Sequence, residues 1–125
     1  MNYVDANILI YALLDGGTKG AKSRELLAAQ KLATSTLSLD EVAFEVGRAS
    51  KEEAIKAVDF LANSPSIVLF PFAPQDVDSF KEMLGKGMKP RDAIHALTAA
   101  KAHASIIYSE DKDFDKLPIT RKTPW

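Results

Sequence analysis

The sequence contains no cysteine among its 125 residues. This absence excludes a disulfide framework, a thiolate metal site and a cysteine nucleophile, and it is compatible with a reducing cytoplasm. Long hydrophobic runs are also missing, because the longest apolar stretch covers only residues 6–14. A bilayer span needs about 20 apolar residues, so we expect no membrane segment and a cytoplasmic protein.

An excess of charge of either sign is missing too. The 16 basic and 17 acidic side chains give a formal net charge of −1, so any surface that binds a polyanion must be local. Hydrophobic residues make up 46% of the chain and charged residues 26%, which places it among ordinary globular proteins. The length suits one compact domain, and we expect residues 1–125 to form it.

Strands and helices are predicted to alternate along the chain. Short apolar segments indicate strands at residues 1–4, 32–36, 67–72 and 105–109. Helical spacing and capping signals indicate helices at residues 7–14, 21–31, 50–62, 74–84 and 91–103, with another starting at residue 38. Glycine-rich residues 15–20 and 85–90 are expected to be a turn and a flexible loop. This alternation predicts an α/β fold with a mainly parallel sheet of about four to five strands, covered on both faces.

Four acidic side chains follow predicted strands or lie in the first turn of predicted helices: Asp5, Glu41, Asp92 and Asp111. In an open parallel sheet the carboxyl ends of the strands line a crevice, so we expect these acids to converge there. Their mutual repulsion would be relieved by a hard divalent cation, and Mg²⁺ or Mn²⁺ prefers oxygen ligands. Zinc is disfavoured because no cysteine or histidine cluster is present.

Each acid also has an ordinary structural interpretation, which stays open. Asp5 can cap the following helix, and Glu41 has capping-box spacing with the serine three residues before it. Asp92 is favoured in a first helical turn by the helix dipole, and Asp111 and Asp113 can be turn acids on a solvated loop. These interpretations do not predict four acids at equivalent places in the topology.

Two other motifs can be tested against the residues. The stretch DKDFD at residues 111–115 begins like a calcium loop, but Lys116 stands where glycine is needed and Lys122 where glutamate is needed. That interpretation is rejected. Asp5 after a first strand is also typical of a phosphoacceptor, although a phosphotransfer hydrolase would need aspartate where Asn7 stands. A phosphoacceptor signalling domain is therefore a weak alternative.

Four segments of the sequence resemble the PIN-domain ribonucleases. They are VDANILIYALL at residues 4–14, LSLDEVAFEV at 37–46, PRDAIHALTAA at 90–100 and IIYSEDKDFDKL at 106–117. They occur in the order and spacing of that family and cover essentially the whole chain. A free-standing domain of this length most resembles the toxin of a VapBC-type toxin–antitoxin pair.

The resemblance implies a three-layer α/β/α fold with Mg²⁺ or Mn²⁺ at the acidic cluster. Carried over by motif, the metal-binding catalytic acids are Asp5, Glu41, Asp92 and Asp111. Asp113 would be an accessory ligand or a supporting acid, and the choice between Asp111 and Asp113 stays open. Asn7 and Ser109 match polar positions that orient ligands or metal-bound water.

The activity that the resemblance implies is endoribonucleolytic. A metal-bound water of lowered pKa would attack an RNA phosphodiester, so no side-chain nucleophile is required. The expected partners are an RNA substrate, a cognate antitoxin protein and a second copy of the chain in a homodimer. A non-catalytic RNA- or protein-binding module of the same fold, and an RNA-maturation nuclease, are the alternatives.

Basic residues near the acids are candidates for RNA contact. Lys86, Lys89 and Arg91 precede Asp92 and are expected to hold backbone phosphates, although any one of them can be an ordinary solvated side chain. A second basic group lies near the C-terminus and comprises Lys112, Lys116, Arg121 and Lys122. His95 is expected to be a packed structural histidine, with general-base work as the alternative.

Overall fold

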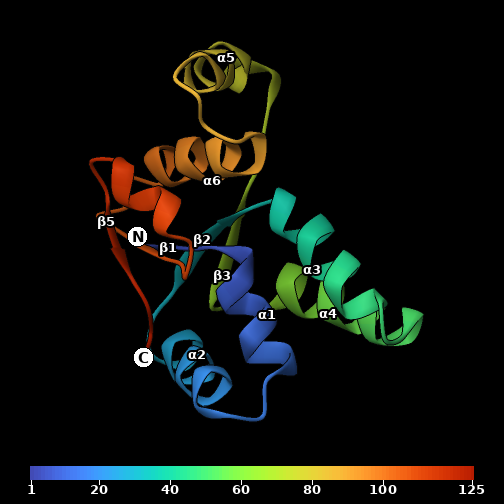
Figure 1. Ribbon diagram of the computed structural model, residues 1–125. Helices are drawn as coiled ribbons and strands as arrows, with labels where there is room; N and C mark the ends of the chain where they lie inside the picture. The colour runs from blue at the N-terminus through green and yellow to red at the C-terminus, as the bar shows by residue number, and fades with distance from the viewer.

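The computed structural model describes residues 1–125 and contains a five-stranded sheet with helices on both faces (Figure 1). The strands are β1 (Tyr3–Val4), β2 (Leu32–Ser35), β3 (Ile67–Phe70), β4 (Ile106–Tyr108) and β5 (Thr120–Lys122). They lie in the order β3-β2-β1-β4-β5, and every pairing is parallel. The predicted α/β fold with a mainly parallel sheet is therefore confirmed.

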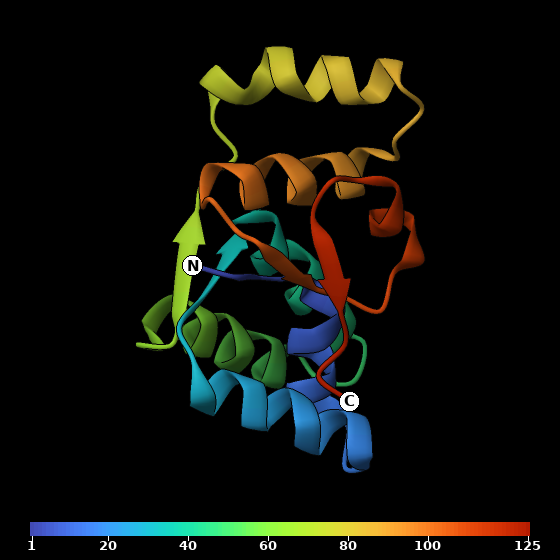
Figure 2. The ribbon, with the colours of Figure 1, turned by 90° about the vertical axis from the view of Figure 1, so that its left-hand side faces the viewer.

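Six α-helices and two short 3-10 helices connect the strands. The α-helices are α1 (Ala6–Leu14), α2 (Thr18–Ala29), α3 (Leu37–Gly47), α4 (Lys51–Asn63), α5 (Val77–Gly85) and α6 (Pro90–Lys101). The 3-10 helices are η1 (Pro74–Asp76) and η2 (Lys112–Lys116). Helices α1 to α4 pack on one face of the sheet and α6 with η2 on the other, while α5 lies outside α6 (Figure 2). No helix combines the length and the hydrophobicity that a membrane span requires.

The central strand β1 contributes to both hydrophobic cores. Neighbouring residues of a strand point to opposite faces, so Val4 joins the core under α1 to α4 and Tyr3 joins the core under α6. Both side chains are fully buried. Since β1 lies between β2 and β4, its carboxyl end brings Asp5 to the middle of one edge of the sheet.

The start of α2 differs from the turn predicted at residues 15–20. The carboxylate Oδ2 of Asp15 accepts hydrogen bonds from the backbone N–H groups of Gly17, at 3.2 Å, and Gly20, at 2.7 Å. This side chain satisfies donors that a helix leaves free in its first turn. The helix therefore begins at Thr18 rather than at Ala21.

One strand lies outside the four predicted segments, and one prediction is corrected. The strand is β5, which pairs with β4 at the edge of the sheet; two of its three residues are exposed, so they carry no apolar signal. The capping-box interpretation of Glu41 is wrong, because α3 begins at Leu37 and Ser38 lies inside it. The Ser38 hydroxyl is hydrogen-bonded to that of Thr34 at 2.7 Å, which leaves Glu41 without a capping role.

Candidate active site and metal centre

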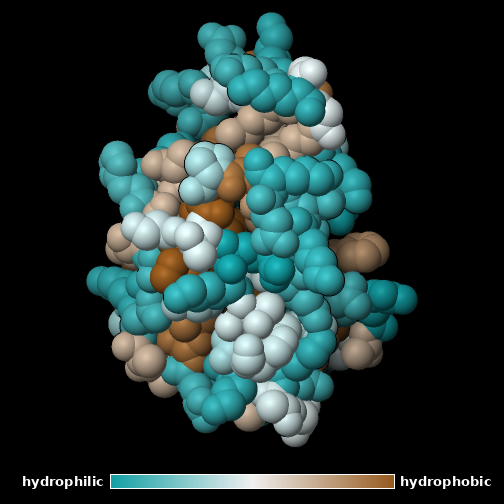
Figure 3. All heavy atoms as spheres, turned by 60° about the vertical axis from the view of Figure 1, so that its left-hand side comes forward, coloured by the Kyte–Doolittle hydropathy of each residue, from teal (hydrophilic) through white to brown (hydrophobic).

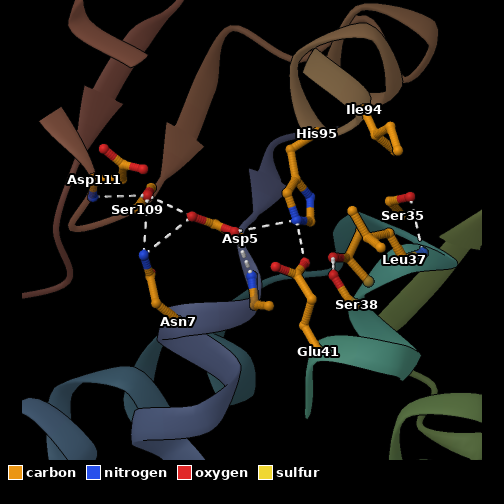
Figure 4. Close-up of polar contacts among 12 residues, drawn as sticks. Asp5, Asn7, Ser35, Leu37, Ser38, Glu41, Ile94, His95, Ser109 and Asp111 are labelled. Atoms are coloured by element: carbon orange, nitrogen blue, oxygen red, sulfur yellow. Dashed lines mark hydrogen bonds and ion pairs between the residues drawn. The ribbon is translucent and has the colours of Figure 1, made fainter. Parts of the chain in front are cut away.

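Asp5 caps α1 and also faces a pocket at the carboxyl edge of the sheet (Figure 4). Its Oδ1 accepts a hydrogen bond from the backbone N–H of Ala6 at 2.7 Å, so the capping interpretation is confirmed. Its Oδ2 accepts hydrogen bonds from the Ser109 hydroxyl at 2.6 Å and the Asn7 amide at 3.1 Å. Burial raises the pKa of Asp5, whereas His95 and the Ser109 hydrogen bond act in the opposite direction.

Ser109 and Asn7 connect Asp5 to the loop that follows β4. The fully buried Ser109 hydroxyl accepts hydrogen bonds from the backbone N–H of Asp111, at 3.0 Å, and from the Asn7 amide, at 3.3 Å. The Asn7 side chain also accepts a hydrogen bond from the backbone N–H of Glu110 at 3.4 Å. These contacts fix the Asp5 carboxylate and the Asp111 backbone relative to each other.

His95 joins Asp5 to Glu41 on the opposite side of the pocket (Figure 4). Its Nε2 lies 2.5 Å from Glu41 Oε1 and 3.4 Å from Asp5 Oδ1, and its Nδ1 lies 2.6 Å from the Tyr3 hydroxyl. Burial lowers the pKa of His95, but the Glu41 hydrogen bond and the surrounding negative charges outweigh it and raise that pKa above its usual value. His95 is thus packed, as the sequence predicts, and it is hydrogen-bonded to Glu41 and within ion-pair distance of Asp5.

Asp92, Asp111 and Asp113 form a second group of acids beside this one. Each offers a carboxylate oxygen, and the three oxygens lie within 4.8 Å of one another. Asp92 comes from the first turn of α6, and Asp111 caps η2 by accepting a hydrogen bond from the Asp113 backbone at 2.9 Å. Burial, together with the charges of Asp111, Asp113 and Asp5, raises the pKa of Asp92 from 3.8 to about 6.

The residues fit a hard divalent cation. Oδ2 of Asp92 is buried and has no hydrogen-bond partner, which is unusual for a carboxylate oxygen and leaves a ligand position open. The donors around it are carboxylates, the ligands that Mg²⁺ and Mn²⁺ prefer. A cation at this point would also remove the repulsion that raises the pKa of Asp92.

One pocket of about 370 Å³ collects most of the predicted site residues. Its lining includes Asp5, Asn7, Glu41, Arg91, Asp92 and Asp111. Asp113 lies instead in an adjoining pocket, next to Lys89, whose Nζ is 3.4 Å from Asp113 Oδ2. Lys86 also lines the adjoining pocket and pairs with Glu82 at 3.3 Å. Apart from Ser109, which lines neither pocket, the predicted residues are divided between two neighbouring pockets.

The second basic group is also divided. Lys116 lines the adjoining pocket, whereas Lys112 and Lys122 line neither pocket. Arg121 is tied to Asp115 at 2.8 Å and to the Ser109 carbonyl at 3.1 Å. Arg121 thus holds β5 and η2 beside the site.

Sequence reasoning missed two residues of α3 that line the first pocket, Asp40 and Phe44. Phe44 is 69% exposed, so its side chain stands at the rim. Glu45 also lines this pocket and pairs with Arg48 at 3.2 Å. The available signal was helical spacing, since residues 40 and 44 lie one turn apart, like Glu41 and Glu45.

Comparison with solved structures finds the same fold in bacterial toxins. VapC20 of Mycobacterium tuberculosis, described as a sarcin–ricin loop cleaving toxin, superposes with a TM-score of 0.79 at 16% identity over 95% of this chain and 98% of that one. VapBC2 of Rickettsia felis, solved with a DNA fragment of its promoter, gives 0.71 at 19% identity over 98% of both chains. A toxin–antitoxin complex from Klebsiella pneumoniae gives 0.73 at 20% identity over 100% and 98%. At these identities the likeness establishes the fold.

A search of curated proteins by sequence finds no match to this chain. The family description "PIN domain" matches residues 3–119, which span strands β1 to β4 and both groups of acids, while β5 follows the matched range. The resemblance carried by the four motif segments agrees with this match. The chain therefore belongs to the PIN domain family.

Proposed function

We propose that the protein is a divalent-metal-dependent endoribonuclease that acts as the toxin of a toxin–antitoxin pair. The observation that carries this proposal is the unpartnered, buried Oδ2 of Asp92 among converging carboxylates. Without a ligand at this point, the fold would gather acids whose charges raise the pKa of Asp92 with nothing to offset their repulsion. The alternative of a non-catalytic module leaves this arrangement unexplained.

The ion would be held by Asp5, Glu41, Asp92 and Asp111, with Asp113 as accessory ligand. A bound Mg²⁺ or Mn²⁺ would lower the pKa of a water molecule and place positive charge beside the phosphate. The protein's own residues then position the donors. Asn7 and Ser109 fix Asp5, and His95 fixes Glu41 through its 2.5 Å hydrogen bond.

Basic residues around the acids provide contact with the RNA backbone. Arg91 lines the first pocket directly beside Asp92, and Lys86 and Lys89 stand at the second. Their side chains are placed to neutralise phosphates on either side of the cleaved bond, which gives binding that weakens with salt. The chain thereby combines a local basic surface with a net charge of −1.

The toxin role rests on the structural neighbours. Their descriptions name VapBC2, a sarcin–ricin loop cleaving toxin and a toxin–antitoxin complex, and this favours a toxin over an RNA-maturation nuclease. We infer a cognate antitoxin as partner, a homodimer as the working state and a cytoplasmic location.

The test replaces single acids and measures RNA cleavage. Asp5→Asn and Asp92→Asn should each reduce cleavage in Mg²⁺ or Mn²⁺ beyond the roughly 10–100-fold typical of residues that only support a metal ligand. EDTA should abolish wild-type activity. Asp78→Asn, on the outer helix α5, is the control and should keep full activity. Wild-type cleavage by the Asp92→Asn protein, or wild-type cleavage in EDTA, would refute the proposal.

A further inference from the structure

A second pocket, of about 590 Å³, adjoins the candidate active site. It lies between the loop that joins α5 to α6 and the segment from η2 to Pro118, which Figure 2 shows on the same side of the molecule. Asp92 lines both pockets, so the two hollows meet at that residue. The volume of the second pocket falls within the range of roughly 300–1,000 Å³ that is usual for pockets that bind small ligands.

The two pockets differ in charge. The first is lined by six acids and a single arginine: Asp5, Asp40, Glu41, Glu45, Asp92, Asp111 and Arg91. The second carries three lysines against two aspartates. Two of these lysines lie beside Asp113, with Lys89 Nζ at 3.4 Å and Lys116 Nζ at 3.7 Å from its carboxylate oxygens. An anionic occupant of the second pocket would therefore meet positive charge next to the site acids.

The apolar side chains of the second pocket rest on the core. Met83, Met88 and Leu117 line it, and all three are half-buried and pack against the hydrophobic cluster between α6 and the sheet. Two of the three methionines in the chain are used here. On the face drawn in Figure 3, hydrophobic atoms are visible between hydrophilic ones below the outermost helix. Methionine sulfur makes favourable contacts with aromatic rings, and its flexible side chain adapts to their shape.

We propose that this second pocket binds one unpaired nucleotide of the RNA substrate, adjacent to the cleaved bond. Its base lies against Met83, Met88 and Leu117, and its phosphate lies beside Lys89 and Lys116. Proteins that hold single-stranded RNA combine a stacking platform for the base, usually an aromatic ring, with cations for the backbone, and here methionine and leucine side chains would provide the platform. This inference rests on the proposed ribonuclease function, because the pocket opens beside the acids of that site.

A segment of a protein partner is the competing occupant, and the pocket suits it less well. The three lysines at the apolar floor share two carboxylates, those of Glu82 and Asp113, and this arrangement favours an anionic ligand with a flat apolar part. A nucleotide has both within one unit, whereas a peptide needs an acidic and an apolar side chain in the correct register.

The experiment crosses protein variants with RNA variants. The substrates are short single-stranded RNAs, one intact and the others each with a single abasic residue at one of the positions that flank the cleaved bond. Cleavage of each RNA is measured with wild type and with Met88→Ala. We expect the abasic residue at one position to lower kcat/KM of the wild type about 10-fold. Met88→Ala should lower kcat/KM on intact RNA by a similar factor and show little further loss on that abasic RNA. Equal losses on both RNAs would overturn the proposal.

Matched controls separate the pocket from general effects on the fold. Leu84→Ala removes a partly exposed apolar side chain of α5 outside the pocket, and it should keep the wild-type response to the abasic RNA. Lys116→Ala should reduce the salt dependence of binding by about one counterion, whereas Lys112→Ala, on the same 3-10 helix, should not. If both lysine variants behave alike, the phosphate contact is refuted.

A binding measurement distinguishes failure of this inference from failure of the proposed function. Fluorescence anisotropy with the same RNAs is measured on the Asp5→Asn background, with and without Met88→Ala. If Met88→Ala weakens binding of the intact RNA but not of the abasic RNA, the nucleotide pocket is supported even if wild type cleaves none of these RNAs. If wild type cleaves RNA but the effects of Met88→Ala and of the abasic residue are independent, the nucleotide pocket is refuted and the proposed function stands. Unchanged RNA binding by Met88→Ala and Lys116→Ala, with weaker binding of the antitoxin, would assign the pocket to the protein partner and overturn the proposal.

Discussion

The surroundings of Asp92 in the candidate site oppose its ionisation. Its pKa is raised from 3.8 to about 6 by burial and by the charges of Asp111, Asp113 and Asp5. An acid whose pKa is higher in the folded state binds protons more tightly there, so the folded state loses relative stability as the pH rises. Ionised Asp92 in the metal-free protein therefore opposes folding.

We predict that metal-free Asp92→Asn is more stable than wild type at neutral pH. The difference should be absent near pH 4, grow between pH 4 and 6, and stay constant above, because this window lies between the unfolded and folded pKa values. After allowance for solvent screening, it should reach on the order of 1–2 kcal/mol. Urea denaturation of both proteins in EDTA, from pH 4 to 7.5, measures it. Added Mn²⁺ should stabilise wild type only, and a less stable variant at pH 7 would contradict the prediction.

The individual acids could be predicted from the sequence because strand ends of a parallel sheet share one edge. Asp5 follows β1, and Asp111 follows β4, so alternation places both at the same edge, and the pairing of β1 with β4 makes them neighbours. The contact of His95 with Glu41 could not be predicted, since 54 residues separate them and the contact depends on how α3 and α6 approach each other. Only the three-residue spacing between Asp92 and His95 indicated that this side chain faces the site.

At the scale of elements, the junction of α1 and α2 depends on close backbone approach. A Cβ atom placed on Gly20 would lie 1.9 Å from the carbonyl oxygen of Asp15 and 2.9 Å from Nη1 of Arg24. That guanidinium donates hydrogen bonds to the carbonyl oxygens of Asp15, at 2.9 Å, and Ala12, at 3.1 Å. It thus satisfies acceptors at the end of α1 that the helix leaves free.

Gly20→Ala should therefore destabilise the protein by about 3 kcal/mol, the upper part of the range for an overpacked site. The added methyl group must separate α1 from α2 or break the Arg24 hydrogen bonds. Gly85→Ala, at the end of α5, meets nothing within 4 Å and should be neutral or stabilising by about 0.5 kcal/mol. Thermal and urea unfolding measure both variants, and equal stabilities would contradict the prediction.

The elements that sequence patterns miss are those set by distant contacts. The three residues of β5 have no apolar alternation, and the strand exists because β4 offers an unpaired edge and Arg121 bonds to the Ser109 carbonyl. The first turn of α2 contains glycine and threonine, which favour a turn locally, and the Asp15 carboxylate overrides this preference. Long apolar stripes, as in α3 and β3, could be predicted because burial alone fixes them.

At the scale of the whole molecule, a cluster at the C-terminus ties the tail to α1, α2 and the site loop. The Lys19 ammonium pairs with Glu110 and lies 5.2 Å from the ring centre of Tyr11 and 5.0 Å from that of Trp125. The Tyr11 hydroxyl donates to Glu110 at 2.5 Å, and its ring meets Trp125 edge to face. Glu110 directly precedes Asp111, so this cluster helps to hold one of the candidate metal ligands in place.

Lys19→Met tests this connection, because methionine keeps an unbranched side chain of similar length and lacks the ammonium group. Trp125 is the sole tryptophan, so its fluorescence reports the cluster alone. We expect stronger acrylamide quenching of the variant, and a loss of RNA cleavage of a few-fold because Glu110 keeps only its Tyr11 hydrogen bond and holds the loop before Asp111 less firmly. High salt should move wild type toward the variant, since the ion pair is partly exposed. Lys22→Met, on the same helix with an exposed partner, should leave quenching and cleavage unchanged. Quenching of Lys19→Met equal to that of wild type at low salt would show that the tail is held by aromatic packing without the cation.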